Sequence, residues 1–237
     1  MLPPIAVALD VPTLDDAVDL AAAVAGAVAV CKVGLELFGA HGPEAVAQIA
    51  QHAPVFLDLK LHDIPTTVRR SARVLGRLGV AMTTVHACGG AAMVSAAVEG
   101  LRAGWEDAGS VGDEPIILAV TVLTSMTAAD LASINAPGSQ TQVPALAALA
   151  VGAGAQGLVC APTDLVAVRA AVGPSTMLVT PGVRPAGSAA DDQARTATPA
   201  AAVANGADLL VIGRPITRAA NPAAAARAIA ESLRQAA

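Results

Sequence analysis

The chain has 237 residues, of which 54% are hydrophobic and 14% charged, and its formal net charge is -5 at pH 7. This hydrophobicity excludes an intrinsically disordered chain, and the acidic balance disfavours a nucleic-acid partner, because phosphate-backbone affinity needs clustered lysine and arginine. The length suits one large core, so residues 1–237 are interpreted as a single domain.

The N-terminal segment and the cysteines bear on the compartment. The segment MLPPIAVALD lacks the regions of a secretory signal, and no apolar run is long enough to span a bilayer. Cys31, Cys88 and Cys160 are odd in number, far apart and embedded in apolar runs, which predicts buried, reduced thiols rather than disulfides or a metal cluster. We therefore expect a soluble cytoplasmic protein without a membrane partner.

Short β-rich runs alternate with longer alanine-rich helical stretches along the whole chain. Thr13 and Thr163 are helix start signals, and Asn221 followed by Pro222 predicts the start of a final helix. Apolar strands joined by crossover helices pair in parallel, and eight such units in this length predict an α/β fold, a (β/α)8 TIM barrel. The strands are predicted at 5–10, 27–35, 55–60, 82–87, 115–123, 157–162, 176–182 and 209–214.

Polar residues stand at or near the carboxyl ends of several predicted strands. In a TIM barrel the carboxyl ends of all strands meet on one face, and that face carries the active site. The asymmetry therefore predicts where the site lies. In chain order these residues are Asp10, Lys32, Asp58, Lys60, His86 and Arg214.

The third predicted strand ends in the most charged segment, DLKLHD (58–63). Residues two apart on a strand point to the same face, so Asp58 and Lys60 are expected to converge, with Lys32 beside them. Alternating charges in a mouth of low dielectric keep a lysine protonated and carboxylates ionised, which favours a catalytic role. A structural ion-pair network at the barrel rim is the alternative.

The seventh and eighth predicted strands end in PGVR (181–184) and GRP (213–215). Glycines let backbone N–H groups approach an anion, and arginine supplies a bidentate fork. The loops after these two strands are the usual phosphate site of this barrel. The polar segment RPAGSAADDQARTATP (184–199) suits a mobile lid over that site. Ordinary surface arginines are the alternative.

The segment FLDLKLHDIP resembles the Asp-x-Lys-x-x-Asp-Ile signature of the orotidine 5'-monophosphate decarboxylase family. The segments ALD, KVGLEL, VTVLTS, PGVR, DDQ and VIGRPIT are similar to further motifs of that family, in its order and spacing. The resemblance spans almost the whole chain. It implies a TIM-barrel enzyme without metal or other cofactor that converts orotidine 5'-monophosphate to UMP and CO2 in de novo pyrimidine biosynthesis, as a homodimer with shared active sites.

The resemblance also implies roles for the matching residues. Lys60 would be the proton donor, Asp58 would lie beside the substrate carboxylate, and Asp63 would reach into the neighbouring subunit's site. The implied catalytic set is Lys60, Asp58, Asp63 and Lys32. The implied substrate-binding set comprises ribose contacts at Asp10, Lys32 and, across the dimer, Thr67, a pyrimidine contact at Thr124, and phosphate-side residues Pro181, Arg184, Gln193, Gly213 and Arg214.

Two rival functions stay open. A related barrel that acts on sugar phosphates shares the Asp-x-Lys-x-x-Asp element, but it needs an acidic Mg2+ ligand near the end of the second strand, where this chain has Lys32. A catalytically silent nucleotide-binding barrel would have no need of Asp58, Lys60 and Asp63 together. The chain also departs from the family, with Thr66 where asparagine is common and no tyrosine for the lid.

Three other conspicuous residues receive structural interpretations. His86 either lines the pocket or packs beneath it. His62 is expected to point out of the pocket, because Lys60 and Asp63 occupy the mouth. Trp105, the single tryptophan, is expected to serve packing rather than substrate stacking.

Overall fold

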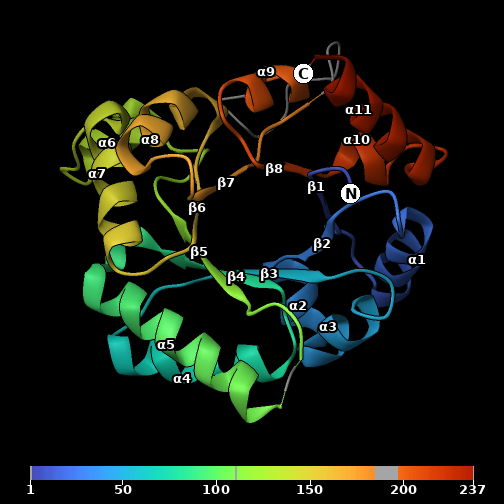
Figure 1. The fold of residues 1–237 in the computed structure, drawn as a ribbon, viewed down its shortest axis with the longest axis horizontal. Helices are drawn as coiled ribbons and strands as arrows, with labels where there is room; N and C mark the ends of the chain where they lie inside the picture. The colour runs from blue at the N-terminus through green and yellow to red at the C-terminus, as the bar shows by residue number, and fades with distance from the viewer. Residues whose placement is uncertain (1, 110, 185–196, 237) are drawn as a thin grey trace.

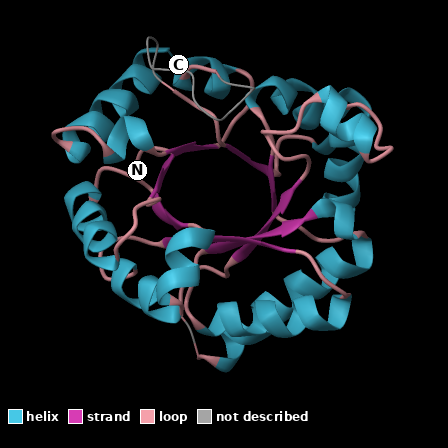
Figure 2. Ribbon diagram, turned by 180° about the vertical axis from the view of Figure 1, so that it is seen from behind, coloured by secondary structure: helices cyan, strands magenta, loops and turns pink. Residues whose placement is uncertain are grey.

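The computed structural model describes residues 2–109, 111–184 and 197–236. Within them, eight parallel strands form a closed barrel in which each strand pairs with the next in chain order. The eighth strand closes the barrel by pairing with the first. Helices surround the strands, as both views show (Figures 1 and 2). The predicted (β/α)8 barrel is confirmed.

Every predicted run contains a strand, but seven of the eight strands are shorter than the predicted runs, and β3 instead extends one residue further, to Leu61. Apolar residues continue beyond the ladder into buried loops, so hydrophobicity alone overestimates strand length. The strands are β1 (Ile5–Ala8), β2 (Val30–Val33), β3 (Val55–Leu61), β4 (Met82–His86), β5 (Ile116–Val120), β6 (Gly157–Val159), β7 (Met177–Thr180) and β8 (Leu209–Ile212).

The helices begin close to the predicted start signals. The Thr13 side chain accepts a hydrogen bond from the Asp16 N–H at the start of the first helix, and Asn221 does the same for Ala224 in the last. Thr163 is not a cap, because it lies inside a 3-10 turn. The helices are α1 (Leu14–Val24), α2 (Leu35–His41), α3 (Pro43–Ile49), α4 (Pro65–Arg77), α5 (Ala91–Asp107), α6 (Ala128–Ser133), α7 (Ser139–Gly152), α8 (Leu165–Val172), α9 (Pro199–Ala204), α10 (Arg214–Thr217) and α11 (Pro222–Ala236), with 3-10 turns η1 (Ala87–Gly89) and η2 (Pro162–Asp164).

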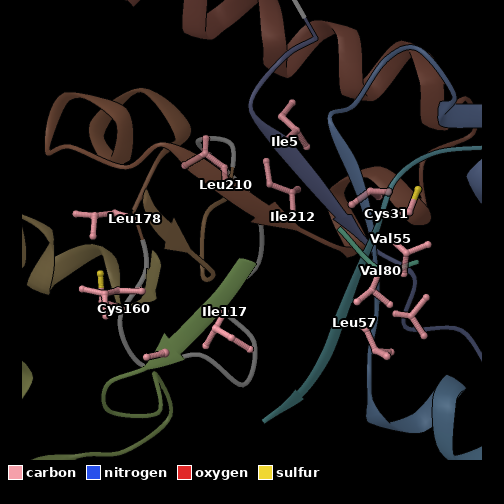
Figure 3. Packing of buried hydrophobic residues seen from close by; sticks show 14 of the residues in the cluster. Ile5, Cys31, Val55, Leu57, Val80, Ile117, Cys160, Leu178, Leu210 and Ile212 are labelled. Carbon is pink, nitrogen blue, oxygen red and sulfur yellow. The ribbon is translucent and has the colours of Figure 1, made fainter. Parts of the chain in front are cut away.

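Side chains of the strands alternate between two apolar cores. One core lies between strands and helices and includes Leu57 and Leu178, which Figure 3 shows among its neighbours. The other fills the barrel interior, where Phe56 is the largest side chain and Val179 packs nearby. Inward positions thus form an apolar floor, on which polar side chains near the strand ends can stand.

The cysteines only partly follow the prediction. Cys31 and Cys160 are buried, whereas Cys88 is exposed because it lies in the η1 turn beyond β4. Burial raises the pKa of the Cys31 thiol to about 12, so this thiol stays protonated at neutral pH. None of the helices in the described part of the chain has the length and apolar character required to cross a membrane.

Candidate active site

A cavity of about 440 Å3 lies at the carboxyl ends of the barrel strands. Its floor is formed by inward-facing residues of the interior, including Phe56, Val159 and Val211. This volume lies within the range of small-molecule sites in proteins. The cavity brings together these residues that the sequence singled out: Asp10, Lys32, Asp58, Lys60, Thr124, Pro181, Arg184, Gly213 and Arg214.

Four side chains on one wall form a row of alternating charge, which we call the charged row: Asp10, Lys32, Asp58 and Lys60. The Lys60 Nζ lies 2.9 Å from each carboxylate oxygen of Asp58. The Lys32 Nζ lies 3.1 Å from Asp10 Oδ1 and 3.9 Å from Asp58 Oδ2. The inner members of the row, Lys32 and Asp58, are largely shielded from solvent. Each ammonium is therefore paired with a carboxylate, and the inner members of the row are poorly solvated.

The backbone that brings Lys60 to Asp58 is not a regular strand. Lys60 has φ +52°, in the left-handed region that residues other than glycine seldom adopt. The register of β3 against β4 also shifts between Leu57 and Leu61. Simple alternation along a strand predicted the convergence of Asp58 and Lys60, but the structure achieves it through a bulge. Such local strain is commonly found at functional sites.

Gly34, directly after β2, provides space for the charged row. A Cβ at this position would lie 3.0 Å from Asp10 Oδ1 and 3.1 Å from Lys32 Nζ. Only glycine lets the Asp10–Lys32 ion pair rest against the backbone without displacing it. The sequence contains this glycine in KVGLEL, but its role depends on the three-dimensional contact.

The opposite wall of the cavity is formed by the loops after β7 and β8. Arg184 and Arg214 line it, together with Gly213. Thr217 and Arg218 also line this wall, and the sequence reasoning missed them because they lie at the end of the short α10 helix rather than at a strand end. Gln193 and most of the predicted lid lie outside the described residues.

The ends of that predicted lid segment meet beside the cavity. The Arg184 N–H donates to the Ala197 carbonyl over 3.0 Å, and the Ala197 N–H donates to the Gly182 carbonyl over 3.3 Å. Gly182 has φ +79°, a conformation that favours glycine at this turn. The backbone of Arg184 is therefore hydrogen-bonded to Ala197, the first described residue after the gap in the described chain.

Two implied site residues lie away from the cavity of their own chain. The cavity walls, as far as the described residues form them, include neither Asp63 nor Thr67. Both are exposed in the segment between β3 and the first turn of α4, where the Asp63 carboxylate accepts a hydrogen bond from the Ile64 N–H over 2.7 Å. Asp63 is thus held at the rim of the barrel.

His86 and His62 lie side by side next to the charged row, with ring centroids 5.4 Å apart. Burial lowers the pKa of His86, and the neighbouring His62 and Lys60 charges lower it further, against the opposing effect of Asp58. His86 therefore favours its neutral form. His62 is exposed, as expected, and neither histidine is among the described residues that line the cavity.

Trp105 is a residue of α5 in the outer helical layer, and its backbone packs closely against Gly76 of α4. The expected packing role of its side chain stays a prediction. Among the described residues, no group of three or more histidine, cysteine, aspartate or glutamate side chains is placed to hold a metal ion.

A closed parallel barrel with a charged cavity at the carboxyl ends of its strands defines a (β/α)8-barrel enzyme. The model of the Orotidine 5'-phosphate decarboxylase / HUMPS family matches residues 3–229. The chain belongs to this family.

Similar proteins cover nearly the full chain. The orotidine 5'-phosphate decarboxylase of Anaeromyxobacter sp. (strain K) is 56% identical over 97% of this chain and 97% of its own. That of Thermobifida fusca is 53% identical over 99% of this chain and 97% of its own. The crystal structure of orotidine 5'-phosphate decarboxylase from Lactobacillus acidophilus matches with a TM-score of 0.84 at 36% identity, over 98% of this chain and 99% of that one.

Proposed function

We infer that the chain is an orotidine 5'-phosphate decarboxylase, which converts orotidine 5'-monophosphate to UMP and CO2 in pyrimidine biosynthesis. Relatives with that name share more than half of their residues with this chain over nearly its whole length. The observation that carries the chemistry is the Lys60 ammonium, 2.9 Å from both oxygens of Asp58 inside the cavity.

The reaction explains why a lysine is needed. Loss of CO2 from C6 of the orotate ring breaks the C6–carboxylate bond and leaves its electron pair in the plane of the ring, where no carbonyl group can delocalise it. A fixed ammonium beside C6 stabilises that developing charge and then donates a proton to the carbon. We assign this role to Lys60, whose position in a poorly solvated cavity strengthens the attraction.

The other members of the charged row orient Lys60 and the substrate. Asp58 holds the Lys60 ammonium and would lie beside the substrate carboxylate, where its charge disfavours the bound substrate more than the transition state. Lys32 and Asp10, which form an ion pair at one end of the row, would contact the ribose hydroxyls, as the family resemblance implies. Thr124, at the cavity wall, would contact the edge of the pyrimidine.

The substrate phosphate belongs at the opposite wall. Arg184, Gly213 and Arg214, which line this wall, form the proposed phosphate grip. The family resemblance adds Gln193, which lies outside the described residues. The phosphate is remote from C6, so this grip can accelerate the reaction only by fixing geometry and closing the site.

The family also contains sugar-phosphate enzymes, the second candidate function. Their Mg2+ would require an acidic ligand near the end of β2, and in this chain that position is the buried Lys32, only 3.9 Å from Asp58. A lysine at that distance from a ligand is unfavourable for a divalent cation. Lys32 therefore favours the decarboxylation of orotidine 5'-monophosphate.

Absorbance-monitored turnover of orotidine 5'-monophosphate, with and without EDTA, tests this assignment. We expect full activity in both conditions, because the Lys60 ammonium supplies the positive charge that a metal would otherwise provide. Activity that disappears with EDTA and returns with Mg2+ would instead support the sugar-phosphate candidate.

We also propose that two chains form a two-fold dimer with shared active sites. Large apolar side chains stand exposed directly after three strands, with Leu35 60%, Ile64 67% and Leu123 37% exposed. They lie in the segments that follow β2, β3 and β5, on the carboxyl side of the barrel, and Ile64 adjoins Asp63 in the chain. A second copy docked on this rim would cover them and receive Asp63 and Thr67 at its own site.

Mixing two inactive variants tests the shared site. Lys60→Ala and Asp63→Asn each damage both sites of their own dimer, but a hybrid dimer has one doubly damaged site and one intact site. With random exchange, half of the dimers are hybrids, so activity should recover to roughly one quarter of the wild-type value. If native mass spectrometry finds hybrids and the mixture stays inactive, Asp63 serves its own chain.

A further inference from the structure

Thr84, a completely buried residue of β4, lies opposite the bulge that carries Lys60. Leu57 pairs with Thr83 and Leu61 pairs with Val85, so four steps along β3 face only two steps along β4. The backbone between Asp58 and Lys60 therefore cannot follow the regular ladder. The backbone N–H and C=O groups of this bulge need hydrogen-bond partners other than the backbone of β4. Thr84 is the β4 residue that lies between the two regular pairs, opposite the bulge.

One hydroxyl group connects the two catalytic positions. The Lys60 N–H donates to the Thr84 Oγ1 over 2.8 Å, and the Thr84 hydroxyl donates to Asp58 Oδ1 over 2.8 Å. The directions follow from chemistry, because an amide N–H can only donate and an ionised carboxylate can only accept. The same Asp58 oxygen also accepts a hydrogen bond from the Lys60 Nζ.

We propose that Thr84 is a positioning residue for decarboxylation, which fixes both the Lys60 backbone and the Asp58 carboxylate. Lys60 has φ +52°, a conformation that persists for a lysine only when its surroundings impose it. The Thr84 Oγ1 accepts the Lys60 N–H in place of a backbone carbonyl of β4, and this hydrogen bond holds Lys60 in its left-handed conformation. This inference rests on the proposed role of Lys60 as proton donor.

The effect on catalysis follows from geometry. Without the hydroxyl, the Lys60 amide loses its buried acceptor and the Asp58 carboxylate loses a donor, so both can rotate away from their present positions. A shift of about 1 Å in a reacting group costs on the order of a hundredfold in rate. Substrate binding depends mainly on the distant arginines, so the chemical step should suffer more than binding.

Thr83 provides a matched control on the same strand. It is equally buried, and its hydroxyl also makes a cross-strand hydrogen bond to β3, to the Leu57 carbonyl over 2.7 Å. That bond reaches the regular part of the ladder, before the bulge. Valine has nearly the shape of threonine, so at either position it removes one buried hydroxyl and leaves the packing in place. If both hydroxyls were purely structural, the two substitutions would have similar effects.

The experiment compares kcat, KM and unfolding free energy for Thr84→Val, Thr84→Ser and Thr83→Val. We expect Thr84→Val to lower kcat by roughly tenfold to a hundredfold with little change in KM. Thr84→Ser keeps the hydroxyl and should stay within about threefold of wild type. Thr83→Val should lose similar stability but keep its kcat. If Thr84→Val does not fold, Thr84→Ala replaces it.

Equal kcat values for folded Thr84→Val and wild type would overturn the proposal, as would equal losses in Thr84→Val and Thr83→Val. If wild type itself does not turn over orotidine 5'-monophosphate, the proposed function fails instead. In that case the crystal structure of Thr84→Val tests whether Thr84 positions Lys60 and Asp58. The proposal requires Lys60 to leave its left-handed conformation or its Nζ to leave Asp58, and an unchanged charged row would contradict it.

Discussion

The two ends of the barrel pair their partly buried charged side chains with different partners. At the carboxyl end, Lys32, Asp58 and Lys60 pair with one another at the wall of a cavity. At the amino end, Arg169 is bound mainly by backbone carbonyl groups in the segments that lead into β7 and β8.

Arg169 of α8 ties three segments of the chain together. Its Nη1 donates to the carbonyls of Gly173 and Thr176, and its Nη2 donates to the Gly206 carbonyl and to Asp208 Oδ2. The same Asp208 oxygen accepts the Leu178 N–H over 2.7 Å. This group, which we call the Arg169 clasp, joins α8 to the start of β7 and the start of β8.

This difference predicts that the two ends of the barrel divide catalysis from stability. The Arg169 clasp joins segments that lead into neighbouring strands and lies outside the described cavity lining, so we expect it to stabilise the barrel rather than to act on a substrate. The charged row contains side chains that can exchange partners, and it tolerates a strained Lys60 backbone. In TIM barrels the carboxyl face carries function and the amino face carries stability, and here the two kinds of charge follow that division.

The largest expected effect is that of Lys60→Ala. Removing both the proton donor and the positive charge should lower kcat by roughly four powers of ten or more, because a well-placed charge is worth about 3–4 kcal/mol and proton delivery adds to it. Absorbance assays measure the rate, and calorimetry with UMP should show that nucleotide binding persists. A Lys60→Ala variant that retains a tenth of the wild-type activity would contradict the proposed role of Lys60 as proton donor.

Arg214→Ala should have the next largest effect on activity. We expect KM to rise and kcat to fall, each by about tenfold to a hundredfold, because phosphate binding helps to close and order the site. The exposed Arg227 of α11 supplies a control, since Arg227→Ala should change neither constant. An increase in KM alone would mean that the grip contributes only uniform binding.

Arg169→Ala should act at the other end and on a different property. It removes four hydrogen bonds and should lower the unfolding free energy by about 2–3 kcal/mol, after discounting for partial solvent exposure. Denaturant titration measures this change. The exposed Arg102–Glu114 ion pair is the control, and Arg102→Ala should cost clearly less stability than Arg169→Ala, because solvent screens an exposed pair. Equal losses would show that the clasp is an ordinary surface contact.

The smallest expected effect concerns pH. The pKa of His86 is lowered in the folded protein, mainly by burial. In the unfolded chain the same side chain binds a proton near the ordinary histidine pKa of about 6.5. The unfolded state therefore binds more protons below that pH, and stability should fall as the pH drops from about 6.5 towards the lowered pKa. Unfolding of His86→Asn should show a weaker decline over this window. An identical decline would assign the effect to other groups.

The sequence predicted the barrel because each strand is an apolar run between helix signals. It could not predict the ends of the strands. Apolar residues such as Val122 and Cys160 continue past the ladder, and nothing in their hydrophobicity marks where pairing stops. Thr163 was predicted to start the next helix, but it lies in the 3-10 turn Pro162–Asp164, and α8 begins only at Leu165.

The cavity residues could be grouped from the sequence because all carboxyl ends of a parallel barrel lie on one face. The details of the charged row depend on register between strands, which composition does not reveal. The bulge at Lys60 and its contact with Thr84 arise only when β3 pairs with β4. Likewise, Gly34 matters only because the Asp10–Lys32 pair folds against it.

The most direct test of the division between the two ends is kcat for orotidine 5'-monophosphate, measured side by side for Lys60→Ala and Arg169→Ala under conditions in which both are folded. We predict that Arg169→Ala stays within about twofold of wild type, because the clasp contributes no residue to the cavity walls formed by the described residues. Lys60→Ala should be lower by roughly four powers of ten or more. Comparable losses in the two variants, or near wild-type turnover by Lys60→Ala, would contradict the account.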